Sequence, residues 1–100
     1  MNHEDTGRND RVGPVLEAGE IAEAVIAAIR SLNSDVLVED RGSYLRVLGP
    51  SPCMVTRAAI EQALGRPFLL PSDLERIMLS FKGTFNMTAE RAEWVWKRAS

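Results

Sequence analysis

The residues of this sequence that could take part in chemistry are few, and they do not converge. Glu17, Glu20 and Glu23 recur at three-residue spacing, which places them on one flank of a helix. Carboxylates bind a metal ion when ligands from several elements converge on it, and a solvated acidic face is a far more common arrangement. The three acids therefore predict a solvated helix face.

The sequence also lacks the signals of an activated nucleophile and of a phosphate-binding loop. The one cysteine, Cys53, has no histidine or lysine near it in the sequence to activate the thiol. The one histidine, His3, lies in a polar N-terminal stretch. Segments 49–52 and 65–67 contain glycine but lack the spacing of a phosphate-binding loop. We expect a chain that is not an enzyme and binds no metal, flavin or iron–sulfur cluster.

One short segment combines side chains that suit contact with another protein. Ser80, Phe81, Lys82 and Gly83 place a hydroxyl, an aromatic ring, a flexible cation and unhindered backbone within four positions. Two interpretations remain open on the residues alone: a docking surface, or a strand end with Phe81 in the core.

The period of the sequence around this segment predicts a strand over residues 76–82. Ile77, Leu79 and Phe81 alternate with Arg76, Met78 and Ser80, as in a half-buried strand. Just upstream, Ser72 and Glu75 have the spacing of a capping box, which favours a helix. We predict a single helical turn over residues 71–75, followed by the strand.

A helix stop precedes that turn. Ile60, Ala63 and Leu64 have helical spacing, and Gly65 follows them as a left-handed cap. Pro67 prevents the helix from resuming because it has no N–H to donate. Thr56 is a suitable N-cap for the start of this helix.

The remaining elements follow from apolar periodicity. Ile21, Val25 and Ile29 predict an amphipathic helix that starts near Gly19 and ends at a left-handed Asn33. Residues 91–99 are compatible with helix or strand; we choose a strand, antiparallel to 76–82 across a turn near 86–88. Three further strands are predicted over residues 12–16, 36–38 and 44–48.

The fold class is therefore α+β: one small domain with a mostly antiparallel sheet, two helices and a helical turn. The order is β-α-β-β-α-(turn)-β-β. A length of 100 residues suits one domain, and residues 1–11 are predicted to be a disordered N-terminal tail before a domain over 12–100. A formal charge of −2 argues against nucleic acid as a partner. One cysteine, no apolar leader and no membrane-length apolar run favour a cytoplasmic protein.

Several segments in order resemble the effector, or coupling, proteins of bacterial multicomponent di-iron monooxygenases. The resemblance covers roughly residues 12–97, and its toluene or alkene monooxygenase branch is the most similar. Methane-oxidising relatives carry small hydroxyl residues where this chain has Leu79 and Phe81, which favours that branch. The segments that carry the resemblance are Val12-Gly13-Pro14, Ala18-Gly19-Glu20, Val38-Glu39-Asp40-Arg41 with Tyr44 and Arg46, Gly65-Arg66-Pro67-Phe68, and Ser80-Phe81-Lys82-Gly83.

The resemblance implies a regulatory subunit that binds the hydroxylase near its di-iron site. It would speed oxygen activation and couple NADH oxidation to hydroxylation or epoxidation, at a surface that overlaps the ferredoxin or reductase site. The alternative is a small-molecule-binding ACT-like regulatory domain. The predicted hydroxylase-binding residues are Val12, Gly13, Pro14, Ile77, Leu79, Ser80, Phe81, Lys82 and Gly83.

Overall fold

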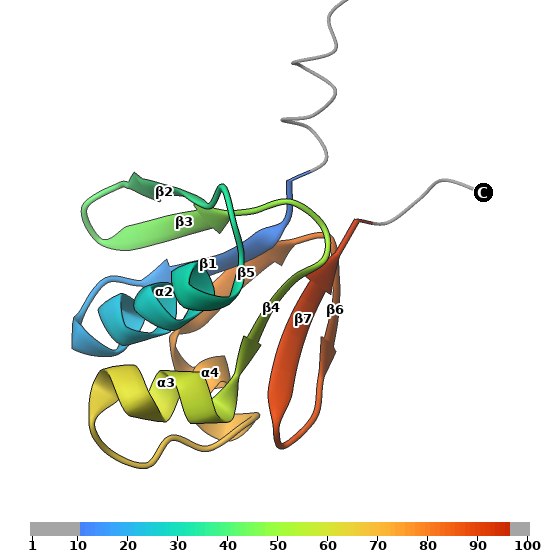
Figure 1. Ribbon diagram of the computed structural model, residues 1–100. Coiled ribbons are helices and arrows are strands. Elements are labelled where there is room, and N and C mark those ends of the chain that lie inside the picture. Colours follow the sequence, from blue (N-terminus) through green and yellow to red (C-terminus); the bar gives the residue numbers. More distant parts are fainter. Residues whose placement is uncertain (1–10, 97–100) are drawn as a thin grey trace, which may run out of the picture.

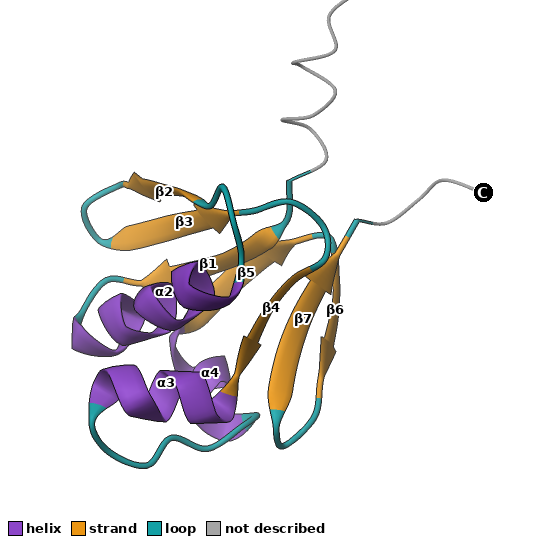
Figure 2. Cartoon of the chain, in the orientation of Figure 1, coloured by secondary structure: helices purple, strands orange, loops and turns teal. Residues whose placement is uncertain are grey.

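The computed structural model describes residues 11–96, which form two antiparallel sheets and three helices (Figures 1 and 2). The larger sheet has the order β2-β3-β1-β5. Its strands are β1 (Gly13–Glu17), β2 (Leu37–Asp40), β3 (Tyr44–Leu48) and β5 (Met78–Lys82). The smaller sheet has the order β4-β7-β6 and consists of β4 (Cys53–Thr56), β6 (Thr84–Met87) and β7 (Arg91–Val95).

Helix α2 (Glu20–Leu32) packs against β4 and against α3 (Arg57–Leu64), and α4 (Ser72–Ile77) leads into β5. The predicted apolar stripe of α2 is confirmed, because Val25 and Ile29 are fully buried. Burial of such side chains is the main force that holds a short helix in place. The largest of the other fully buried side chains in the core are those of Leu16, Ile60, Phe68, Leu74 and Trp94.

Both predicted ends of α3 are confirmed. The Thr56 side chain accepts a hydrogen bond from the Ala59 N–H at 3.1 Å, which satisfies one free donor of the first turn. At the other end Gly65 has φ 81°, and its N–H donates to the Glu61 carbonyl at 2.8 Å. The sharp stop that follows lets the chain turn back toward α4.

The α+β class is confirmed, but the predicted element order misses two strands. β4 occupies Cys53–Thr56, a stretch with only four residues between a proline-rich loop and a helix. β6 occupies Thr84–Met87, where we expected the approach to a turn. Segments this short give too few repeats for the two-residue period to be recognised.

The pairing predicted for the last strand is wrong, although its strand conformation is confirmed over Arg91–Val95. β7 pairs with β4 and β6, and not with β5. The turn lies at 88–90, where the Thr88 hydroxyl accepts hydrogen bonds from the Glu90 and Arg91 N–H groups. Because β6 was not predicted, the strand over residues 76–82 was the nearest available pairing partner for the last strand.

Three local predictions also need correction. Arg76 and Ile77 still belong to α4, so β5 starts at Met78. No side-chain capping bond forms at the start of α4; instead the Asp73 carboxylate accepts the Leu69 N–H at 2.8 Å. Asn33 is extended, and its side chain bonds to the Ile29 carbonyl and to the backbone of β4.

The chain enters the domain at Arg11, the last residue of the predicted tail. Its guanidinium pairs with the Asp35 carboxylate at 2.8 Å. The rest of that tail and residues 97–99 of the predicted last strand lie outside the described residues. None of the helices in the described part of the chain is long and apolar enough to cross a membrane.

Candidate docking surface

The predicted contact segment lies on the outermost strand of the larger sheet. β5 has β1 as its neighbour on one side and is the last strand in the order, so its other side is open among the described residues. Leu79 is 57% exposed and Phe81 is 43% exposed, and Ser80 between them is also exposed. We call Leu79, Ser80 and Phe81 the docking edge. Large apolar side chains on an open strand are typical of interaction sites.

A bulge in β5 explains why Leu79 points outward. Ser80 lies opposite Val15 and Met78 lies opposite Leu16, so Leu79 has no partner on β1. An extra residue of this kind breaks the strict alternation of side chains. Met78 packs against the core, whereas Leu79 and Phe81 are exposed, contrary to the predicted half-buried face.

The residues predicted at the start of the chain lie behind the docking edge rather than on it. Val12, Gly13 and Pro14 are buried. A Cβ at Gly13 would overlap the Val47 carbonyl oxygen, so β1 and β3 can approach only with glycine there. These three residues support β5 from inside the sheet and offer little surface to a partner.

The last three predicted site residues border the docking edge. Ile77 is half-buried at the end of α4, and Lys82 is half-buried at the end of β5. Gly83 has φ 103°, and a Cβ there would lie 2.8 Å from both the Val95 carbonyl oxygen and a Val12 methyl group. Gly83 is therefore the corner between the two sheets, which only glycine fits.

Two aromatic residues outside the predicted hydroxylase-binding set, Phe85 and Trp94, continue inward from the docking edge. The Phe81 and Phe85 ring centroids are 5.2 Å apart, and the Phe85 and Trp94 centroids are 5.3 Å apart. Phe85 and Trp94 are directly opposite on β6 and β7. Phe85 and Met87 alternate with polar Thr84 and Asn86, but two apolar positions are too few to establish the period of a strand.

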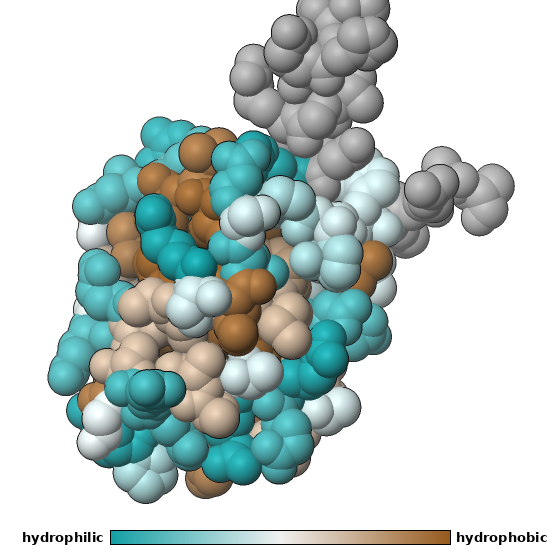
Figure 3. All heavy atoms as spheres, viewed as in Figure 1, coloured by the Kyte–Doolittle hydropathy of each residue, from teal (hydrophilic) through white to brown (hydrophobic). Residues whose placement is uncertain are grey.

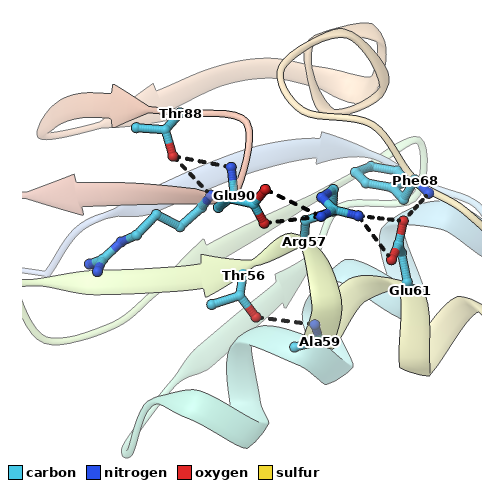
Figure 4. Close-up of polar contacts among 8 residues, drawn as sticks. Thr56, Arg57, Ala59, Glu61, Phe68, Thr88 and Glu90 are labelled. Carbon is cyan, nitrogen blue, oxygen red and sulfur yellow. Dashed lines mark hydrogen bonds and ion pairs between the residues drawn. The ribbon is translucent and has the colours of Figure 1, made fainter.

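A polar cluster joins the β6–β7 turn of the smaller sheet to α3 (Figure 4). The Arg57 guanidinium donates to the Glu61 carboxylate at 3.2 Å and to the Glu90 carboxylate at 3.0 Å. The Phe68 N–H also donates to Glu61, at 2.9 Å, and this bond, assisted by Arg57, lowers the pKa of Glu61. The cluster thus joins α3, the loop after it and the β6–β7 turn.

The described residues offer no alternative site with evident chemistry. No group of three or more acidic, histidine or cysteine side chains in residues 11–96 is placed to hold a metal ion. Cys53 is buried, and desolvation raises its pKa to about 11, so its thiol is protonated and unreactive.

A hollow of about 410 Å³ lies between α2 and the β2–β3 hairpin, where hydrophobic surface gathers in Figure 3. Its apolar lining includes Ile26, Val38 and Leu45.

Comparison with known proteins gives matches over most of the chain. Residues 10–95 match the model of the MmoB/DmpM family. The effector subunit of the alkene monooxygenase system of Xanthobacter autotrophicus is 44% identical over 88 residues, which is 86% of either chain.

A solved structure has a similar fold. A chain in the structure of the phenol hydroxylase–regulatory protein complex superposes with a TM-score of 0.75, covering 87% of this chain and 98% of that one. Sequence identity in this pair is 15%, so the likeness concerns the fold alone.

Proposed function

Because the chain belongs to the MmoB/DmpM family, we propose that it is the effector subunit of a multicomponent monooxygenase and binds the hydroxylase component. In this proposal the hydroxylase supplies the di-iron site and the substrate pocket, and the effector contributes no catalytic residue. The family match spans residues 10–95, and nothing favours the ACT-like alternative.

The relative from Xanthobacter supports an alkene or a related hydrocarbon as the substrate of the complex. That protein is the effector subunit of an alkene monooxygenase system, and the two chains agree at 44% of 88 positions. The apolar residues at Leu79 and Phe81 agree with the toluene or alkene branch that the sequence suggests. The cytoplasmic location of the protein stays a prediction from the sequence.

The observation that carries the docking proposal is the exposed apolar edge on β5. Covering a large apolar side chain completely is worth about 1.5–3 kcal/mol, and Leu79 and Phe81 are each about half exposed. Together they supply roughly 1.5–3 kcal/mol on this basis. A contribution of this size is large enough to be measured as a change in affinity.

Binding can change the hydroxylase only through a difference in affinity between its conformations. An effector that binds one conformation tenfold more tightly stabilises it by about 1.4 kcal/mol relative to the other. We propose that the favoured conformation activates oxygen faster and couples NADH oxidation to product more tightly. The electron donor, a ferredoxin or reductase, is proposed to use an overlapping surface, so that the two partners alternate.

The test compares two leucines that are equally exposed. Leu79 is 57% exposed on the docking edge, and Leu69 is 59% exposed in the loop before α4. Leu79→Ser should raise the Kd for the hydroxylase by up to about tenfold and lower its turnover and coupling, whereas Leu69→Ser should change neither. Ser80→Lys, which adds a bulky charge to the same edge, should weaken binding as well. All three variants should melt like the wild type.

Two results would contradict this proposal. If the hydroxylase turns over equally well without the protein, the chain is not its effector. If Leu79→Ser and Ser80→Lys stay folded and stimulate the hydroxylase as the wild type does, the contact lies on another surface, such as the exposed side of α3.

A further inference from the structure

We propose that Phe85 is a positioning residue for the docking edge: it holds the Phe81 ring in place and transmits docking to Trp94 in the second sheet. The inference rests on the proposed function, because it concerns how the same edge binds. Phe85 itself is half-buried, and Phe81 is the exposed member of the stack.

Three aromatic rings form a continuous path from the surface to the core. Phe81 is 43% exposed, Phe85 is half-buried and Trp94 is fully buried. The centroid distances of 5.2 and 5.3 Å lie within the range of favourable aromatic pairs, with interplanar angles of 38° and 25°. The path crosses from β5 in the larger sheet to β6 and β7 in the smaller one.

The backbone gives this path a mechanical basis. β5 passes directly into β6 through the single corner residue Gly83 (Figure 1), so Phe81 and Phe85 lie on one bent segment. A displacement of Phe81 therefore acts on Phe85 both through the contact of the rings and through the three residues of chain between them. At the far end Nε1 of Trp94 is buried and has no hydrogen-bond partner among the described residues. The indole lies in the core, and its stacking on the Phe85 ring is one of the contacts that set its position.

An exposed aromatic ring normally exchanges between rotamers, and binding must then fix it. Contact with Phe85 fixes Phe81 before a partner arrives, and this reduces the entropy lost on binding. Through this contact Phe85 affects the affinity for the hydroxylase, although it is less exposed than Phe81. If Phe85 served packing alone, its loss would lower the stability of the domain without changing affinity.

The first experiment separates these roles with two substitutions at one position. Phe85→Leu keeps an apolar side chain but removes the ring face, and Phe85→Tyr keeps the ring. We expect Phe85→Leu to raise the Kd for the hydroxylase by about three- to tenfold, and Phe85→Tyr to bind like the wild type. Both are assayed well below their melting temperatures. Unchanged affinity in a folded Phe85→Leu protein overturns the inference.

The second experiment uses the free protein and does not depend on a partner. The chain has two tryptophans, so Trp96→Phe leaves Trp94 as the only site for a 5-fluorotryptophan label. We expect Phe81→Ala to shift the fluorine resonance of Trp94, and Phe81→Ala with Phe85→Leu to add little beyond Phe85→Leu alone. Leu79→Ala, a change at an exposed apolar residue outside the stack, is the control. A Phe81→Ala shift no larger than that of Leu79→Ala overturns the inference.

The same label reports docking in the complex. Adding unlabelled hydroxylase should move the Trp94 resonance of the Trp96→Phe protein, and Phe85→Leu should remove most of that change. If the wild type fails to bind the hydroxylase at all, the proposed function fails. If it binds with the Trp94 resonance unmoved, the function stands and the transmission through Phe85 is wrong.

Discussion

Gly83→Ala should destabilise the domain far more than its small size suggests. With φ 103°, Gly83 has a backbone conformation that costs an L-residue about 1–3 kcal/mol. The added Cβ would also lie 2.8 Å from the Val95 carbonyl oxygen and from a Val12 methyl group. Forcing an extra carbon into a filled space typically costs another 1–3 kcal/mol. The sum is about 2–6 kcal/mol, against a total stability of about 5–15 kcal/mol for a domain.

Gly65→Ala is the matched control for this experiment. Gly65 also has a positive φ of 81°, but a Cβ there meets nothing within 4 Å. It should therefore show the conformational cost without the packing cost. In thermal melts followed by circular dichroism, the Tm of Gly83→Ala should lie below that of Gly65→Ala by at least about 4 °C, the shift expected from 1 kcal/mol in a domain of this size.

Equal melting temperatures for the two alanine variants would refute the reasoning, since the corner would then tolerate a side chain. The result also bears on how docking is tested. A bulky residue at Gly83 would seem a direct way to block a partner that approaches the strand end. Because it would first disturb the junction between the sheets, lost activity in such a variant carries no information about docking.

Two further predictions concern titratable groups. The pKa of Glu61 is lower in the folded chain than in the unfolded chain, so its stabilising effect is complete above the unfolded pKa and is lost as the pH falls through the folded value. The Tm of the wild type should therefore exceed that of Glu61→Gln at neutral pH and converge with it on acidification; a gap that stays constant with pH would contradict the pKa shift. Cys53, with a pKa of about 11, should react with a thiol reagent at mildly alkaline pH only after the protein is unfolded, and reaction of the native protein at the rate of a free thiol would show that the side chain is accessible.

Local signals in the sequence predicted those elements whose ends are set by a single residue type. The Thr56 and Gly65 caps fix α3 because each acts on its own backbone, and both are read directly from the chain. The strip of apolar residues in α2 is long enough for its period to be recognised. The prediction that Leu79, Ser80 and Phe81 lie on a strand is also confirmed, because a polar residue between two apolar ones is a local signal.

What could not be predicted depends on partners distant in the sequence. The short strands β4 and β6 exist because β7 lies between them, and neither has enough residues to show a period alone. The bulge at Leu79 brings Met78, and not Leu79, opposite Leu16 and against the core, and it arises from the pairing of β5 with β1. The burial of Val12, Gly13 and Pro14 likewise follows from the position of β1 inside the sheet.

The open side of β5 has a consequence for the free protein as well as for the complex. Unpaired backbone beside two exposed apolar side chains is a template on which a second copy of the same strand could assemble. The bulge at Leu79 and the lysine at position 82 are two features that make such self-pairing irregular. In the function proposed above, the subunit releases its partner in every cycle, and this strand is then uncovered. The sequence of β5 must therefore allow binding to the hydroxylase and, at the same time, prevent self-association.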